Sequence, residues 1–147
     1  MFYFYRNGDY LAEICISDEV DHEEHLAEKG ITPLLALAPA DYPTDPLSHK
    51  FREAWDVQNG ELGIDHTKAR LVKENELKAN VDALLAAIDE KKIRSLSDAI
   101  LTGDNTRLTA LEAQAINLRG IRGGLAAALA ALSELSDIDA FSIDQAE

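Results

Sequence analysis

Leucines spaced seven residues apart near the C-terminal end constrain the fold of this chain more than any other feature. They are Leu111, Leu118, Leu125 and Leu132. Leu129 and Ala115 occupy companion positions between them, although Arg122 interrupts this second series. A repeat of this kind places a narrow apolar seam along one helix, and another helix has to cover that seam.

The covering helix has two alternative sources. It can belong to the same chain, which gives an intrachain helical hairpin, or it can belong to a second copy. The residue pattern is compatible with both, so the seam leucines are candidate self-association residues and a homo-oligomer is expected. These candidates are Leu111, Leu118, Leu125, Leu129 and Leu132.

A long helix is predicted before the leucine repeat. Apolar residues recur with spacings of three and four over residues 77–88, and the stripe continues over residues 93–101. Asp65 is a suitable N-cap for this helix. The helix should end at Gly103-Asp104-Asn105, where the asparagine or Thr106 can cap the next helix.

Glycines are expected to interrupt the last helix. Gly120, Gly123 and Gly124 lie within the leucine repeat, and each glycine costs about 1 kcal/mol relative to alanine in a helix. A kink or turn is therefore predicted there. Residues 65–136 then form a helical module of two to four helices, in part coiled-coil-like. Residues 137–147 form an acidic tail, expected to be an extended docking strand or a loose end.

Residues 1–38 are predicted to form a small β-rich unit with the element order ββαβ, which makes the fold class α+β. Its first two segments, residues 2–5 and 10–16, are rich in aromatic and β-branched side chains. Asn7-Gly8 lies between them and accepts positive φ at little cost, which signals a hairpin.

A helix and a third strand should complete this unit. The helix is predicted over residues 19–29, with Ser17 or Asp18 as its N-cap. The strand is predicted over residues 31–37, where Pro33 favours the edge of a sheet. An open strand edge with apolar side chains can bind the strand of a partner. The candidate partner-binding residues in this segment are Ile31, Leu35 and Leu37.

Residues 39–64 are predicted to link the two parts of the chain, because prolines punctuate their first half. Phe51 and Trp55 fall on one face of a short helical turn and are further candidate partner-binding residues. A core anchor is the alternative for Trp55. Asn59-Gly60 signals a second turn, which suits a small hairpin or an extended arm.

The net charge of −13 is unevenly distributed. Acidic side chains are in excess over residues 1–60 and 123–147, whereas residues 61–122 carry equal numbers of acidic and basic ones. A nucleic-acid binder needs a basic stripe to displace counterions, and the sequence contains none, so no nucleic-acid partner is expected. No apolar run approaches the roughly 20 residues of a membrane span. The start lacks the pattern of a secretory signal, so the chain is expected in the cytoplasm without a membrane partner.

The candidate reactive groups do not match a known reaction centre. His22-Glu-Glu-His25 has the wrong spacing for the zinc-protease helix, so a solvated helix face is expected. The glycine-rich segment 120–124 follows a helix and lacks the ending of a phosphate-binding loop. Cys15 is the sole cysteine and is expected to be a small buried thiol. The sequence therefore predicts a non-enzymatic protein with no metal and no cofactor.

Several short motifs occur in a recognisable order. They are Pro43-Thr-Asp-Pro46, Phe51-Arg-Glu-Ala-Trp55, Asp65 followed by Lys68-Ala-Arg70, Gly103-Asp104 and Leu118-Arg119. In this order they resemble the tail-fibre assembly proteins of tailed bacteriophages, over about half of the chain. After Leu118-Arg119 the chain departs from that family, which tends towards aspartate and proline there, because a glycine-rich segment and an alanine-leucine helix follow.

The resemblance implies a function in particle assembly. It implies a helper that binds a phage tail-fibre protein in the host cytoplasm and aids its folding or trimerisation, in some cases remaining on the virion tail. The alternative is a permanent structural subunit of the tail, baseplate or fibre. The family supplies no catalytic residues, so the resemblance adds none to this chain.

Overall fold

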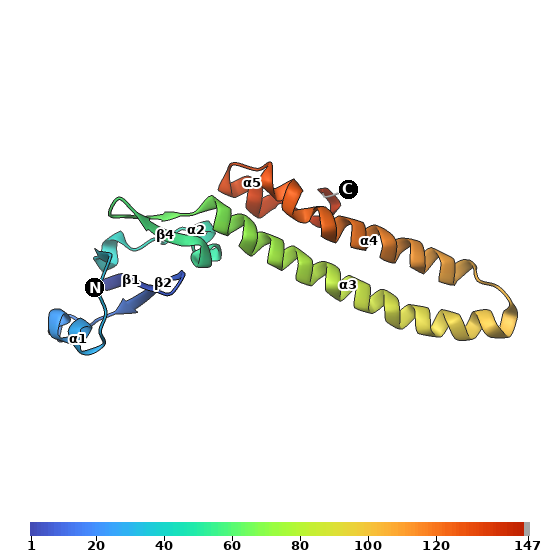
Figure 1. Ribbon diagram of the computed structural model, residues 1–147, viewed down its shortest axis with the longest axis horizontal. Helices are drawn as coiled ribbons and strands as arrows, with labels where there is room; N and C mark the ends of the chain where they lie inside the picture. The colour runs from blue at the N-terminus through green and yellow to red at the C-terminus, as the bar shows by residue number, and fades with distance from the viewer. Residues whose placement is uncertain (146–147) are drawn as a thin grey trace. The chain divides into compact units, whose positions relative to one another are not determined.

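The computed structural model describes residues 1–145 and divides into two compact units, Met1–Ala69 and the remainder from Arg70. The first unit contains all the strands, and the second is helical (Figure 1). A long helix, α3, His66–Thr102, begins in the first unit and continues into the second. The predicted α+β class, with a small β-rich region before a helical module, is confirmed.

The first unit consists of two small sheets and short helical segments. In chain order these are β1 Phe2–Asn7, β2 Tyr10–Cys15, α1 His22–Glu28, β3 Leu35–Leu37, η1 Pro39–Asp41, α2 Pro46–Lys50, η2 Arg52–Ala54, β4 Trp55–Gln58 and β5 Glu61–Ile64. The η elements are single turns of 3₁₀ helix. The first sheet is antiparallel with strand order β2-β1-β3, and the second pairs β4 with β5.

Both predicted turns are hairpin turns. Asn7 pairs with Tyr10 across the first, and Gly8 has a φ of 63°. Asn59 and Gly60 form the second, with φ values of 54° and 82°. Positive φ at both central residues of this second turn is the type I′ geometry that matches the twist of two paired strands. In the first turn the central residues are Gly8 and Asp9, and only Gly8 has positive φ. The predicted hairpins are confirmed, and the second is a hairpin and not an extended arm.

The helix and third strand of this unit are shorter than predicted. Residues 17–20 form a turn, so Asp21 takes the N-cap position of α1 and its carboxylate accepts a hydrogen bond from the Glu24 N–H at 3.1 Å. Strand β3 has three residues and lies at one edge of its sheet. The edge position predicted from Pro33 is confirmed. Cys15, expected to be buried, is exposed, while the following Ile16 is buried.

The segment predicted as a linker, residues 39–64, belongs to the first compact unit together with residues 1–38. Its aromatic side chains pack on the first sheet, and Glu13 of β2 forms an ion pair with Arg52. The unit boundary lies after Ala69 and not at residue 38, because these long-range contacts outweigh the local breaking effect of the prolines.

The second unit is built on an antiparallel helical hairpin. Helix α3 ends at Gly103, whose φ is 76°, and α4, Thr106–Ala130, returns alongside it (Figure 1). At the start of α3, the Asp65 carboxylate accepts hydrogen bonds from the N–H groups of Thr67 and Lys68, which confirms the predicted cap. Asn105 takes the N-cap position of α4 without a side-chain hydrogen bond.

Helix α4 runs through the glycines without a break, so the kink predicted at residues 120–124 is wrong. Ile121 and Leu125 flank these glycines and are buried. Burial of two large aliphatic side chains stabilises by about 3–6 kcal/mol, which offsets the roughly 3 kcal/mol that three helical glycines cost.

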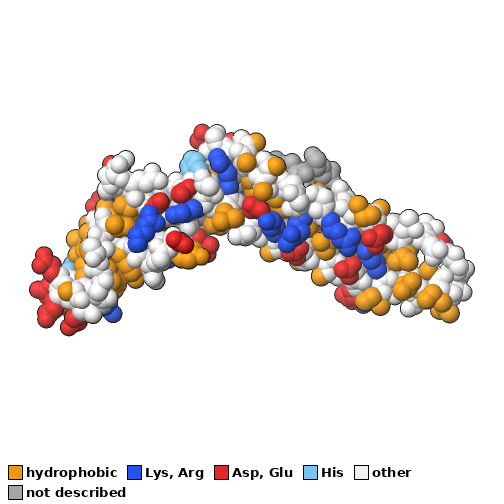
Figure 2. Space-filling model, in the orientation of Figure 1, with side chains coloured by type: hydrophobic (Ala, Val, Ile, Leu, Met, Phe, Trp, Pro, Cys, Tyr) orange, Lys and Arg blue, Asp and Glu red, His pale blue; other side chains and the backbone are white. Residues whose placement is uncertain are grey.

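Polar contacts connect α3 to the chain that returns alongside it. They include the ion pairs Asp82–Arg122 and Lys92–Glu112 with α4, and a hydrogen bond donated by the Arg70 guanidinium to the Leu132 carbonyl just after α4. As the residue number rises on α3 it falls on the returning chain, which defines an antiparallel pair. In Figure 2, Lys, Arg, Asp and Glu side chains gather over the middle of this hairpin.

The leucine seam lies within this hairpin. Leu111, Leu125 and Leu129 are buried, and Leu118 packs against the cluster that Leu111 forms with Ile88 of α3. Of the two alternatives that the sequence left open, the structure has the intrachain hairpin. The seam is therefore already covered and is not an exposed surface for self-association.

The acidic tail is neither extended nor loose over residues 135–141. Leu135–Ala140 form helix α5, and a 3₁₀ turn, η3, follows at Ile143–Gln145. Ile138 and Phe141 are buried within the second unit. Ile138 lies on the buried face of α5, whereas Phe141 follows the helix with extended backbone and is buried as well.

Candidate interaction surfaces

The two aromatic residues proposed as partner anchors lie in the core of the first unit. Phe51 is 1% exposed and Trp55 is 3% exposed. The indole N–H of Trp55 donates to the Ser48 carbonyl at 3.0 Å, so its polar atom is satisfied internally. Phe4 contacts the Trp55 ring edge-on, with the ring centroids 6.1 Å apart. In this fold Phe51 and Trp55 are core residues that a partner cannot reach. For Trp55 this is the core anchor that the sequence left open as the alternative.

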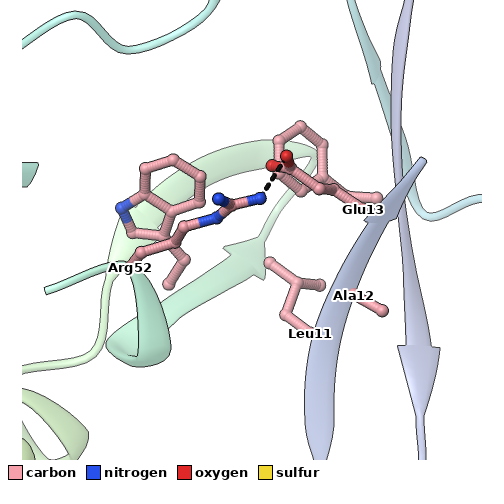
Figure 3. Close-up of a pocket in the computed structure, with 6 residues that line it drawn as sticks. Leu11, Ala12, Glu13 and Arg52 are labelled. Carbon is pink, nitrogen blue, oxygen red and sulfur yellow. Dashed lines mark ion pairs between the residues drawn. The ribbon is translucent and has the colours of Figure 1, made fainter. Parts of the chain in front are cut away.

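A small polar network lies over this core (Figure 3). The Arg52 guanidinium sits 5.7 Å from the centre of the Trp55 ring and forms an ion pair with Glu13. The Tyr42 hydroxyl donates to the second oxygen of the same carboxylate at 2.9 Å. Burial, together with this hydrogen bond, raises the pKa of Tyr42. The sequence reasoning missed Glu13 and Tyr42, because nothing in the local pattern signals contacts made 29 to 39 residues away along the chain.

A pocket of about 200 Å³ is bounded by this network. Its lining consists of Phe4, Leu11, Ala12, Glu13, Arg52 and Trp55. Glu13 and Arg52 form an ion pair beside it. This pair holds η2 against β2.

The edge of the first sheet is open near the third strand. Strand β3 pairs only with Phe2, Tyr3 and Phe4, whereas β1 continues to Asn7. A groove of about 720 Å³ runs beside the unpaired end of β1, and its lining includes Ile31 and Leu34. Leu34 is 46% exposed. Unpaired backbone beside exposed apolar side chains is the type of surface to which a partner strand can add.

The predicted residues of this edge differ in exposure. Leu35 and Leu37 are half-buried, Ile31 is half-buried beside the groove, and Ala36 between the two leucines is exposed. Of the five predicted partner-binding residues, only these three lie at an accessible surface. Leu34, which the sequence reasoning passed over, is the more exposed side chain.

The apolar stripe of α3 differs from the prediction over its last third. The prediction placed Ile93, Leu96 and Ile100 on the buried face, but they are 70%, 50% and 76% exposed. Ser95 and Ala99 are buried instead. The buried repeat continues from Ile88 with spacings of four and three, so it reaches these small residues and misses the large ones.

The histidine pair has structural contacts. The His22 ring donates from Nε2 to the Ser17 carbonyl at 3.0 Å, and its Nδ1 then accepts from the Tyr3 hydroxyl at 2.7 Å. His22 thus holds α1 against β1. Within residues 1–145, no group of three His, Cys, Asp or Glu side chains is placed to hold a metal ion.

Comparisons with known proteins give no relative for this fold or these surfaces. No helix of the described chain is both long enough and apolar enough to cross a membrane. The sequence matches no protein-family model and no curated protein, and no solved structure matches the fold.

Proposed function

We propose that this chain is a non-enzymatic assembly helper that binds the fibre protein of a phage tail and aids its folding or trimerisation. The support is the ordered set of motifs that resembles the tail-fibre assembly proteins, together with an accessible surface that suits a fibre. The host cytoplasm is the proposed place of action, and retention on the virion tail is compatible with the same surface.

The motif residues occupy positions that define the fold. Phe51 and Trp55 form the core of the first unit, and Asp65 caps α3. Lys68 pairs with Asp56, and Gly103 forms the turn between the two long helices. These residues serve the fold of this chain, so the partner specificity has to come from other residues.

The observation that carries the proposal is the open edge beside β1 and β3. A fibre awaiting assembly exposes unpaired strand edges and apolar surface, and it aggregates through them. A helper that offers a strand edge with adjacent apolar side chains can occupy those groups until the fibre trimerises. The edge beside Leu34 and Ile31 has both components.

The acidity of the first unit supports the same role. Helix α1 carries Glu23 and Glu24 in its first turn, and the chain as a whole has a net charge of −13. A strong net charge keeps a protein with an exposed strand edge soluble and limits its self-association through that edge. It also disfavours partners that are themselves acidic.

Co-expression with a phage tail-fibre protein tests the proposal. The wild-type chain should raise the amount of soluble trimeric fibre, and Leu34→Asp should lower that yield because it places a charge at the apolar edge. Val20→Asp is the matched control, since Val20 is similarly exposed at 44% in the same unit but does not line the groove. A fibre yield that is independent of the wild-type chain would contradict the proposal.

Purified particles distinguish a helper that leaves after assembly from the alternative. A permanent structural subunit of the tail, baseplate or fibre would appear in mature virions as a stoichiometric band at 16.1 kDa. A helper that leaves after assembly would be absent from the particles while remaining necessary for soluble fibre.

A further inference from the structure

Helix α3 carries two adjacent seams. The first contains its buried and half-buried positions Val81, Leu85, Ile88, Lys92, Ser95 and Ala99. The second, one residue further on, contains the exposed positions Asp82, Ala86, Asp89, Ile93, Leu96 and Ile100. Both have the alternating spacing of four and three that keeps one face towards a neighbouring helix. A helix with two such seams is typical of a bundle in which it has two neighbours.

Near the turn between α3 and α4, the buried seam has small residues and the exposed seam has large aliphatic ones, the reverse of the usual distribution. The buried side contains Ser95, at 2% exposure, and Ala99, while Ile93, Leu96 and Ile100 face solvent on the second seam. Large aliphatic side chains are normally the ones removed from water. Three of them on one exposed face make this face a candidate contact surface for another molecule.

Helix α4 contributes a matching row on the same face. Its exposed positions Glu112, Ile116, Arg119 and Gly123 are spaced by four, three and four residues. Asp82 of the second seam pairs with Arg122, which precedes Gly123 of this row, and Lys92 of α3 pairs with Glu112. These pairs place the row on the side of α3 that carries the second seam. Ile116 is 61% exposed.

We propose that a second copy of this chain covers this face, so that two hairpins form a four-helix bundle. The proposal does not rest on the proposed function, because it concerns the chain alone. Residues 61–122 carry equal numbers of acidic and basic side chains, so two such faces approach without the repulsion that a net charge of −13 would otherwise impose.

Under a two-fold axis, the charges on this face are complementary to the charges on the same face of a second copy. Asp82 of the second seam and Arg122 of α4 lie at the same level and form an exposed ion pair within the chain. Arg119 and Glu112 of α4 form another such pair. A two-fold axis along the hairpin sets α3 of one copy opposite α4 of the other. Asp82 of each copy then faces Arg122 of its partner, so these exposed ion pairs can be shared between the two copies, and the aliphatic residues of both copies meet near the turn.

The mass in solution tests the proposal. Light scattering of the wild-type chain at micromolar concentration should give twice the chain mass of 16.1 kDa. Ile93→Ser with Ile100→Ser should raise the dissociation constant of the dimer by about 100-fold or more, because two aliphatic contacts are lost. Leu101→Ser is the matched control, since Leu101 is 84% exposed on the same helix but lies outside the second seam, and it should leave the dimer intact.

Charge reversal tests the arrangement independently of the aliphatic residues. Arg119→Glu with Arg122→Glu should give a monomer, and Asp82→Lys with Asp89→Lys should also give a monomer. An equimolar mixture of the two variants should restore the dimer, because each supplies the charges that the other lacks. Circular dichroism should show that each variant keeps its helices.

Several results would overturn the proposal. A wild-type monomer would leave this face for a different partner, and a dimer that survives Ile93→Ser with Ile100→Ser would have its contact elsewhere. Variants of opposite charge that stay monomeric when mixed would rule out the arrangement of α3 opposite α4.

Discussion

Arg122 stands where the leucine repeat of α4 should have an apolar residue, and it reaches out to Asp82 of α3. Its guanidinium donates to both carboxylate oxygens, from Nε at 2.7 Å and from Nη2 at 3.1 Å. Such a two-point contact fixes both the distance and the orientation of the two helices. Arg122, which interrupts the leucine seam, therefore connects α3 and α4 through an ion pair that lies beside the seam.

This ion pair predicts an acid-dependent loss of stability. The hydrogen bonds from Arg122 lower the pKa of Asp82 below its ordinary value of 3.8. A carboxyl whose pKa is lower in the folded state stabilises the fold above its unfolded pKa, and that contribution is lost as the pH falls through the folded pKa. Asp82→Asn should lower the thermal midpoint at neutral pH, and the difference from wild type should vanish below the folded pKa.

Two further carboxyls act in the same direction. Lys92 lowers the pKa of Glu112, and hydrogen bonds from Thr106 lower the pKa of Asp104. The control for the pH series is Asp98→Asn, which removes an exposed carboxylate from the same helix as Asp82. High salt should shrink the effect of Asp82→Asn because the pair is exposed. Equal pH dependence for wild type and Asp82→Asn would contradict the assigned cause.

The leucine seam predicts a large packing effect. Leu125 is fully buried, so Leu125→Ala should lower the free energy of unfolding by about 2–5 kcal/mol. Leu101→Ala, at a largely exposed position, should change it by less than about 0.5 kcal/mol. Urea unfolding followed by circular dichroism at 222 nm measures both. A change below about 1 kcal/mol for Leu125→Ala would mean that the hairpin is not packed as described.

The hydroxyl of Ser95 predicts a stabilising substitution. Its Oγ is buried without a hydrogen-bond partner, and such a group costs about 1–3 kcal/mol. Ser95→Ala should therefore raise the thermal midpoint by roughly 2–4 °C for each kcal/mol regained. Ser97→Ala is the control, because Ser97 is exposed and its hydroxyl donates to the Ile93 carbonyl. A midpoint lowered by Ser95→Ala would indicate that the hydroxyl has a partner in solution.

The buried aromatic core predicts that the first unit depends on Phe51. Phe51→Ala should destabilise this unit by about 3–5 kcal/mol, while the exposed Tyr10→Ala should have little effect. Trp55 is the sole tryptophan, so its fluorescence reports this unit selectively, and circular dichroism mainly reports the helical unit. A Phe51→Ala chain with unchanged fluorescence unfolding would return Phe51 to the list of surface anchors.

The sequence by itself determined the turns, the helix caps and the helix ends of this fold. The Asn59-Gly60 turn, the cap at Asp65 and the end of α3 directly before Gly103 were predicted at the right residues, and the first turn was predicted within one residue, since Asn7 belongs to β1. Each depends on the φ angle of one or two residues or on a hydrogen bond spanning three residues. The side chain and its immediate neighbours decide such features, so they can be read without knowing the rest of the molecule.

The accessible surfaces of the candidate site were decided only by the tertiary structure. The core positions of Phe51 and Trp55, the exposure of Ile93 and Ile100 and the packing of Phe141 depend on residues far away in the chain. An amphipathic pattern specifies that one face of a helix will be buried. Which of two adjacent seams is buried depends on the helix that packs against it, here α4 against α3. That choice depends on the sum of many long-range contacts, none of which is encoded within a single segment.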